Sequence, residues 1–343
     1  MENNKEVLLR VENLCQYFGK VKAVDDVTFD IKKGEVFGLV GESGCGKTTT
    51  GRSIIKIYDI TSGSIYFKGK RIRAGTKAYR DEIAALRADK NPENAAANKE
   101  RIAQLRAEIR QAKKDHAATG TVTDIQMIFQ DPIASLNPRM TVKEIVSEGL
   151  VIQGEKDPKV IEEKVYKILE LVGLVREHAG RYPHEFSGGQ RQRIGIARSV
   201  IMHPELLIAD EPISALDVSI QAQVINLLNE LRETLDLTIL FIAHDLSVVK
   251  YFSDRIGVMY FGKLVELAPA DELFAHPLHP YTKSLLSAIP LPDPRREKMR
   301  TRIAYNPSVH DYSQDKPTMR EVKPGHFVYC NDAEARQYQE ELG

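Results

Sequence analysis

A run of eight residues, Gly41 to Thr48, has the residue types and spacing of a loop that binds phosphate. Its sequence is Gly41-Glu42-Ser43-Gly44-Cys45-Gly46-Lys47-Thr48. This matches the pattern G-x-x-x-x-G-K-[ST], in which successive backbone N–H groups surround the phosphates of a nucleotide. We expect Lys47 to reach the β- and γ-phosphates and the Thr48 hydroxyl to ligate Mg²⁺.

A phosphate-binding loop of this kind connects a strand to a helix, and the residues on both sides of Gly41–Thr48 fit this arrangement. Residues 36–40 form an apolar run of strand length that leads directly into Gly41. The glycines permit positive φ angles and a close approach of the backbone to phosphate. We predict that a helix begins near Gly46 or Lys47, so that its unpaired N–H groups and the positive end of its dipole face the anion.

A second apolar run, Leu206-Leu207-Ile208-Ala209, ends in two acids, Asp210 and Glu211. A buried strand here would place Asp210 at the edge of a sheet, where its carboxylate could hold Mg²⁺ through water. Glu211 is one residue further on and points differently, so it could polarise an attacking water as a general base. Such a strand is common by itself and becomes informative when it follows a phosphate loop.

The segment Ser187-Gly188-Gly189-Gln190 precedes a helical pattern. Ser187 and Gln190 have the spacing of a capping box, which is a purely structural explanation. Two glycines in a first helical turn nevertheless cost about 1 kcal/mol each relative to alanine. They are explained if backbone N–H groups there must approach an anion. The chain would then have two helix N-termini suited to phosphate, although one nucleotide needs only one.

Composition narrows the class of protein. Lys+Arg and Asp+Glu both number 48, and this balance argues against a dedicated nucleic-acid binder. Three scattered cysteines argue against a disulfide framework and fit a reducing compartment. The first residues lack the apolar stretch of a signal peptide, and no apolar run reaches the length of about 18 residues expected of a membrane span. We therefore expect any action at a membrane to pass through a partner.

The order of patterns along the chain predicts an α/β fold. Residues 7–70 read as short strands with turns, interrupted by the loop and its helix. Residues 131–185 look helical, with Gly173 as a C-terminal stop, and apolar strands return at 205–210 and 237–243. This alternation implies a parallel sheet covered by helices, with ligands at the carboxyl ends of the strands. No internal repeat is present.

Residues 71–120 differ from their surroundings, being rich in Ala, Arg, Lys and Glu. Tyr79, Ile83 and Leu86 would share one helical face, and Ile102, Leu105 and Ile109 would share another after a break at Asn91-Pro92. We interpret the segment as two short helices packed as an antiparallel hairpin. A solvated charged linker would have the same composition.

In this order the motifs resemble those of the ATPase subunits of ATP-binding-cassette (ABC) transporters. The resemblance runs from about residue 7 to 290 and includes Gln130 after the run 125–129, the segment 214–217 and His244 after a strand. Phe186 stands where many members have Leu. The family implies a P-loop NTPase fold of the ABC type, with an antiparallel β subdomain, a helical subdomain and a C-terminal extension. The expected boundaries are 7–265 for the ATPase domain, with the insert at 71–120 and the helical subdomain at 131–190, and 266–343 for the extension.

The resemblance also implies a role for each matching residue. In that family two subunits pack head-to-tail, and each ATP lies between the phosphate loop of one subunit and the signature segment, here Ser187-Gly188-Gly189-Gln190, at the start of a helix of the other. Phe18 is expected to stack on adenine, with Tyr17 as the second choice. Glu211 is the catalytic base, His244 senses the γ-phosphate, and Asp217 links the two sites. The catalytic set is Glu211, His244 and Gln130, and the metal set is Thr48, Gln130 and Asp210. The nucleotide-binding set is Phe18, Gly41, Glu42, Ser43, Gly44, Cys45, Gly46, Lys47, Thr48, Thr49, Ser187, Gly188, Gly189, Gln190 and Asp217.

The segment from His276 to Leu286 resembles the C-terminal extension of oligopeptide and dipeptide importer ATPases. We therefore expect an ATPase that powers peptide uptake, with ATP and Mg²⁺ as cofactors. Its expected partners are a second homologous ATPase in a heterodimer, two membrane permeases and an extracytoplasmic peptide-binding protein, with no nucleic acid. This places it at the cytoplasmic face of the cell membrane. Because nickel importers share the extension, an ATPase of a nickel or other small-solute importer is the alternative, and a DNA-repair ATPase of the same superfamily is a further one. Cys330 stands alone in the tail, so it cannot supply a four-cysteine iron–sulfur cluster.

Overall fold

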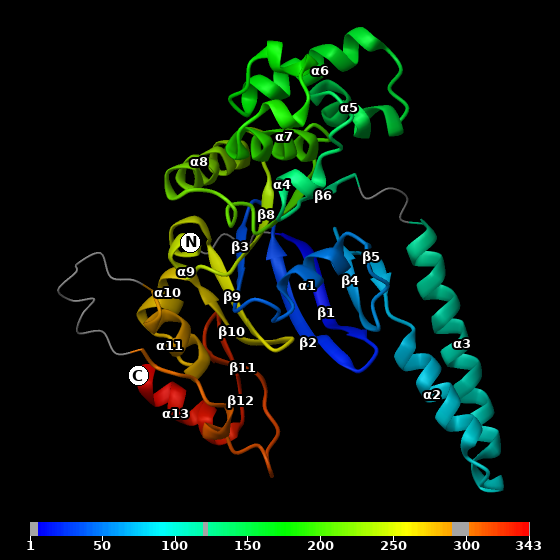
Figure 1. Ribbon diagram of the computed structural model, residues 1–343. Coiled ribbons are helices and arrows are strands. Elements are labelled where there is room, and N and C mark those ends of the chain that lie inside the picture. Colours follow the sequence, from blue (N-terminus) through cyan, green and yellow to red (C-terminus); the bar gives the residue numbers. More distant parts are fainter. Residues whose placement is uncertain (1–5, 119–122, 290–301, 343) are drawn as a thin grey trace. The chain divides into compact units, whose positions relative to one another are not determined.

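The computed structural model describes residues 6–118, 123–289 and 302–342. These residues divide into two compact units, each described here by itself (Figure 1). The β unit contains residues 6–33, 43–118 and 259–264. The α/β unit contains residues 34–42, 123–258, 265–289 and 302–342. Residues 119–120 of the predicted insert and residues 290–301 and 343 of the predicted C-terminal extension lie outside the described residues.

The β unit is built on an antiparallel four-stranded sheet in the order β2-β1-β4-β5. Its elements are β1 (Val7–Phe18), β2 (Val21–Lys32), α1 (Lys47–Ile54), β4 (Ser62–Phe67) and β5 (Lys70–Ala74). In β2 the buried side chains Val27, Phe29 and Ile31 alternate along the strand, because one face of the sheet covers the core. The strands predicted between residues 7 and 70 are therefore present, and β5 continues this sheet into the segment predicted as a helical insert.

Two helices follow β5, α2 (Lys77–Ala88) and α3 (Ala95–Ala118), and they lie side by side (Figure 1). Ile83 of α2 and Leu105 of α3 are buried, and the Arg101 guanidinium contacts the Glu82 carboxylate at 2.8 Å. The predicted hairpin is thus confirmed, although its second arm has 24 residues and is longer than expected.

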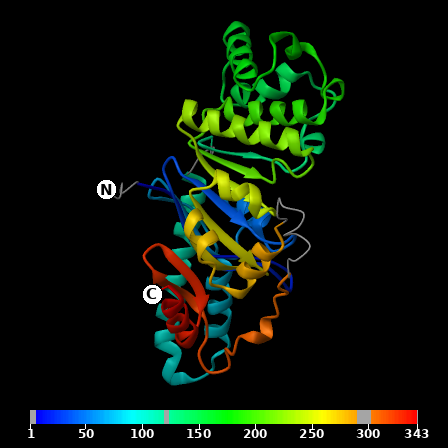
Figure 2. The same cartoon turned by 90° about the vertical axis from the view of Figure 1, so that its left-hand side faces the viewer.

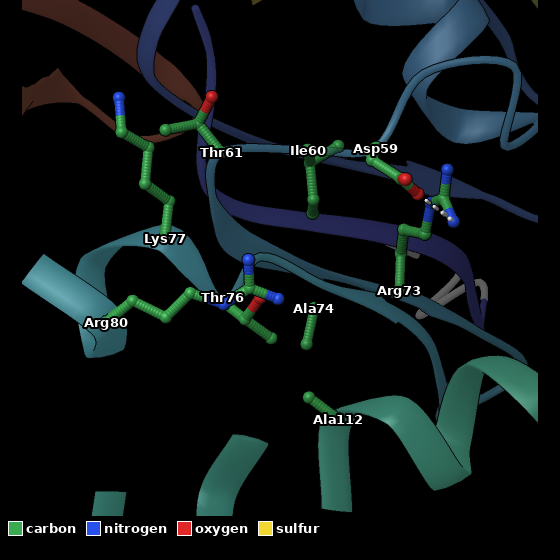
Figure 3. Close-up of a pocket in the computed structure, with 9 residues that line it drawn as sticks. All are labelled: Asp59, Ile60, Thr61, Arg73, Ala74, Thr76, Lys77, Arg80 and Ala112. Carbon is green, nitrogen blue, oxygen red and sulfur yellow. Dashed lines mark ion pairs between the residues drawn. The ribbon is translucent and has the colours of Figure 1, made fainter. Parts of the chain in front are cut away.

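Where the hairpin meets the sheet, the structure has a cavity of about 430 Å³ (Figure 3). Three of its nine lining residues are basic, and the buried Arg73 is paired with Asp59 at 3.3 Å. The lining residues are Asp59, Ile60, Thr61, Arg73, Ala74, Thr76, Lys77, Arg80 and Ala112.

The α/β unit contains an eight-stranded sheet in the order β11-β12-β10-β9-β3-β8-β7-β6. Strands β9, β3, β8, β7 and β6 are parallel, whereas β12 is antiparallel to both β10 and β11. The strands are β3 (Val36–Val40), β6 (Ile125–Ile128), β7 (Leu206–Asp210), β8 (Thr238–Ala243), β9 (Arg255–Tyr260), β10 (Lys263–Pro269), β11 (Thr318–Lys323) and β12 (His326–Cys330). Every residue of β3, β7 and β8 is buried, which explains their continuous apolar sequences.

The helices of this unit are α4 (Pro132–Ser135), α5 (Val142–Ile152), α6 (Pro158–Leu171), α7 (Gly188–Val200), α8 (Val218–Leu235), α9 (Leu246–Phe252), α10 (Ala270–Ala275), α11 (Pro280–Ser287) and α13 (Asp332–Leu342). Figures 1 and 2 show α5 and α6 grouped on the side of α7 away from the sheet. Helix α6 stops as predicted, because Gly173 adopts φ 74° and its N–H bonds back to Glu170.

The C-terminal segment extends the large sheet. The hairpin of β11 and β12 pairs with β10, and α13 packs on β11 and β12 (Figure 1). The boundary expected at residues 265 and 266 therefore falls inside β10. Buried side chains of this region, including Leu278, Val328 and Tyr338, form a small core of their own.

Candidate functional site

Three polar side chains meet at the carboxyl ends of neighbouring parallel strands in the α/β unit. Gln130 follows β6, Glu211 follows β7 and His244 follows β8. Because β6, β7 and β8 pair in parallel, their carboxyl ends lie at one edge of the sheet. All three residues were expected from the sequence to act in catalysis, and the topology brings them together.

The three side chains converge on one carboxylate oxygen. Gln130 Nε2 donates to Glu211 Oε2 at 3.2 Å, and His244 Nδ1 lies 3.2 Å from the same oxygen. The Glu211 side chain is 12% exposed, whereas that of His244 is 54% exposed. Both contacts therefore fall on Oε2 of the Glu211 carboxylate.

The backbone of Glu211 is itself unusual. Its φ of 45° lies in the left-handed region, which costs a non-glycine residue on the order of 1–3 kcal/mol. The Glu211 N–H donates to Ile242 O at 2.9 Å, and the Ser214 hydroxyl donates to Glu211 O at 3.1 Å. These bonds hold the strained turn that follows β7. Asp210, the last residue of β7, is fully buried.

The phosphate loop begins at the same sheet edge, since Val40 of β3 pairs with Ala243 of β8. In the β unit, α1 starts at Lys47 with Gly46 as its N-cap, as predicted. Gly46 has φ 111°, and a Cβ there would lie 2.3 Å from Ala23 O, so only glycine fits. The loop thus has the backbone that the pattern requires. Ser43 in the loop is exposed, and Thr48 and Thr49 in the first turn of α1 are partly exposed.

Lys47 is 3% exposed, and its Nζ donates to Cys45 Sγ at 3.8 Å. Cys45 is buried, and burial raises the pKa of its thiol above the ordinary value, against the lowering effect of Lys47. A raised pKa reduces the thiolate fraction at neutral pH, so Cys45 is a small spacer of low reactivity.

The two aromatic candidates for stacking on adenine are unequal. Tyr17 donates its hydroxyl to Asp25 at 2.5 Å, and burial together with this bond raises its pKa. Phe18 is 45% exposed and meets the ring of Tyr58 edge-to-face at 5.2 Å. An exposed ring face is what a flat base needs, so Phe18 is the better placed of the two.

The signature segment caps α7 as the sequence predicts. Ser187 Oγ accepts from Gln190 N at 3.3 Å, and Gln190 Oε1 accepts from Ser187 N at 3.1 Å. Ser187 and Gly188 are exposed. Gly189 has a packing reason as well, because a Cβ there would lie 2.8 Å from Ile220 Cγ2 of α8. The interpretation that both glycines serve an anion is therefore incomplete, and it applies best to Gly188.

Asp217 is the N-cap residue of α8, but its side chain makes no capping hydrogen bond. It is exposed, and the next residue, Val218, is 82% exposed. A carboxylate and an apolar side chain directed to solvent at a helix start are available to a second chain.

The structure also shows a contact to the phosphate loop that the sequence did not reveal. The hydroxyl of Tyr281, at the start of α11, accepts the backbone N–H of Glu42 at 3.0 Å. Tyr281 is 2% exposed. No periodic pattern marks this residue, and only its place in the segment 276–286 could have drawn attention to it.

Comparison with known proteins gives two family matches. Residues 24–124 and 107–214 match the family described as ABC transporter, and residues 265–317 match the family described as oligopeptide/dipeptide transporter, C-terminal region. The chain is 57% identical to the oligopeptide transport ATP-binding protein OppF of Bacillus subtilis (strain 168), covering 97% of this chain and 99% of the relative. It is 49% identical to the oligopeptide transport ATP-binding protein AmiF of Streptococcus pneumoniae, covering 98% and 99%.

Among solved structures, cbiO1 from Clostridium perfringens, part of the ABC transporter complex cbiONQ, matches with a TM-score of 0.59 and 27% identity. That match covers 79% of this chain and 92% of the other. Within the described residues, no helix combines the length and apolar character that crossing a membrane would require.

Proposed function

The chain belongs to the ABC transporter family, and from this premise we propose that it hydrolyses ATP to power the uptake of oligopeptides or dipeptides. The convergence of Gln130 and His244 on the Glu211 carboxylate is the observation that supports hydrolysis. The peptide cargo is supported by the names of the relatives and by the family match at residues 265–317.

Nucleotide binding rests on the loop. Its backbone N–H groups and Lys47 hold the phosphates, and Phe18 stacks on the base. The loop fits a phosphate chain because Gly44 has φ 79° and open space at its Cβ position, while Gly46 starts α1 with a left-handed backbone. Left-handed glycines of this kind are typical of loops whose backbone N–H groups bind phosphate.

The metal that accompanies ATP is Mg²⁺. The predicted donors are the Thr48 hydroxyl, the Gln130 amide oxygen and the Asp210 carboxylate, all hard oxygen ligands of the kind that Mg²⁺ prefers. The side-chain nitrogen of Gln130 donates to Glu211, so the side-chain oxygen of Gln130 is the atom that would ligate Mg²⁺. When bound, the metal neutralises charge that develops on the phosphates.

Glu211 then acts as the base that takes a proton from water. Gln130 and His244 hold its Oε2 oxygen, which orients Oε1 toward that water. We assign the sensing of the γ-phosphate to His244, whose half-exposed ring supports this role. Positioning and charge stabilisation are the main sources of rate in such reactions.

The active assembly is a head-to-tail dimer with a homologous ATPase. The exposed residues Ser187 and Gly188, followed by Gly189 and Gln190, contact the ATP held by the neighbouring chain, and Asp217 bridges the two sites. Two permeases and an extracytoplasmic binding protein complete the importer, at whose cytoplasmic face this subunit lies. A nickel importer ATPase is the remaining alternative, since the sequence features of the extension do not distinguish the two.

Uptake in intact cells tests the proposal. Cells that lack this chain are expected to lose accumulation of labelled tri- to pentapeptides, and to regain it with the wild-type gene but not with the Glu211→Gln variant. Nickel accumulation is measured in parallel. Loss of nickel uptake with unchanged peptide uptake would reject the peptide cargo.

A further inference from the structure

The segment from His276 to Leu286 marks the cargo class in the family comparison, but its structural position indicates a second role. Tyr281 is 2% exposed, and its hydroxyl accepts the Glu42 N–H at 3.0 Å. Glu42 is the second residue of the phosphate loop and lies two residues after the end of β3. The C-terminal extension therefore contacts the backbone from which the loop departs.

Tyr281 is held by a buried polar network. The Glu266 carboxylate of β10 accepts the N–H groups of Leu278 at 2.9 Å and His279 at 3.0 Å. Glu266 also contacts His326 Nε2 of β12 at 2.8 Å, and both side chains are fully buried. A carboxylate with these partners fixes the chain just before α11.

His279 transmits this placement to Tyr281. It is the N-cap of α11, and its Nδ1 accepts the Tyr281 N–H at 3.1 Å. Burial is the main reason that its pKa is lowered to about 3, with His310 contributing. The ring is therefore neutral at physiological pH, and Nδ1 keeps the lone pair that this bond needs.

The loop beyond Glu42 has reason to need such support. Gly44 has φ 79° and Gly46 has φ 111°, and glycines lose more conformational freedom on ordering than other residues. A fixed hydrogen bond at the start of the loop lowers the entropy that is lost when nucleotide binds. The Glu42 side chain is exposed, so the backbone N–H is the group that the extension holds.

We infer that Tyr281 is a positioning residue for the phosphate loop, which makes the C-terminal extension a support for nucleotide binding in addition to its link with cargo. This inference rests on the proposed function in so far as the loop binds ATP. It predicts a change in nucleotide affinity with little change in the chemical step, because the hydroxyl touches neither substrate nor Glu211.

The test replaces Tyr281 by Phe, which keeps the buried ring and removes the hydroxyl. Affinity is measured with the fluorescent analogue trinitrophenyl-ATP, and kcat and KM are measured in the complete transporter. We expect the Kd and the KM to rise about two- to tenfold, with kcat within twofold of wild type. Tyr338→Phe, the same change in another buried tyrosine of the extension, is the matched control and leaves Kd unchanged.

A second pair of variants checks that the effect passes through the Glu42 N–H. Glu42→Pro removes the donor, so adding Tyr281→Phe to it should weaken nucleotide binding no further. Unchanged Kd in Tyr281→Phe, equal losses in Tyr281→Phe and Tyr338→Phe, or a fall in kcat at constant KM would each overturn the inference. Absence of hydrolysis in the wild-type complex would instead count against the proposed function, while the Kd comparison would still decide the role of Tyr281.

Discussion

Replacing Glu211 by Gln tests the catalytic arrangement most directly. The substitution removes the proposed base but keeps the shape of the side chain and one oxygen that can accept a hydrogen bond from Gln130 or His244. In the wild type, Gln130 Nε2 and His244 Nδ1 each lie 3.2 Å from Glu211 Oε2. The strained backbone of the turn should persist, because the bonds from Ser214 and to Ile242 use main-chain atoms of residue 211. Structure and ATP binding are therefore expected to survive.

The size of the effect follows from the step that is lost. A positioned general base contributes about 10²- to 10⁴-fold in rate. At about 1.36 kcal/mol per tenfold change, this corresponds to about 3–5 kcal/mol of transition-state stabilisation. The Kd for ATP should stay within about twofold, because a single uncharged replacement outside the loop removes no phosphate contact.

Phosphate release from the assembled transporter gives the rate, and size-exclusion chromatography with ATP shows whether a closed dimer accumulates. Glu205→Gln is the matched control, because Glu205 lies just before β7, at the opposite end of the strand from Glu211. Turnover of Glu211→Gln within threefold of wild type would refute the assignment of Glu211 as the base. An equal loss in both variants would show a structural effect on β7 in place of a chemical one.

Three further predictions concern single groups. Alkylation of Cys45 by iodoacetamide should be slower at pH 7 than that of a cysteine peptide, because burial raises the thiol pKa; it should speed up as the pH rises, and ATP should protect, which mass spectrometry can follow. Ser187→Ala removes the cap of α7 and should lower the free energy of unfolding by about 1 kcal/mol; it should also slow hydrolysis in the dimer, whereas an effect on stability alone would contradict a role toward the neighbour's ATP. The pKa of His279 is about 3 in the folded chain and 6.5 in the unfolded chain, so between these pH values the unfolded chain binds more protons and the free energy of unfolding falls as the pH falls. The variant His279→Asn can still cap α11 but lacks this titration. Its Tm should therefore fall less than that of the wild type between pH 7 and pH 5.

Short-range patterns predicted the local structure well. The apolar runs became β3, β7 and β8, the Ser187–Gln190 spacing became a capping box, and Gly173 ended α6. Each of these features depends only on residues within one helical turn or one strand, so the local sequence is sufficient to predict it. The candidates Gln130, Glu211 and His244 followed from motif order, but their convergence depends on the pairing of β6, β7 and β8.

Long-range features could not be predicted in this way. Gly189 has no room for a larger side chain because Ile220 of another helix packs against it. The left-handed backbone of Glu211 is held by a hydrogen bond to Ile242 in the next strand. The contact between Tyr281 and Glu42 joins residues 239 positions apart. Such pairs produce no recognisable periodicity or spacing in a single sequence, because they arise when elements that are far apart along the chain pack together.

The state of the signature helix bears on how ATP could drive the importer. Ser187 and Gln190 satisfy each other's backbone groups, so α7 is capped without any ligand. Contacts from Ser187 and Gly188 to a neighbour's ATP would therefore add binding free energy in the closed dimer without being needed for the fold. A ligand shifts a conformational equilibrium only by its difference in affinity between the two states. In the proposed head-to-tail dimer these contacts would form only in the closed state and would supply that difference. Hydrolysis would remove it, because it cleaves the bond to the γ-phosphate that the neighbour's α7 would contact.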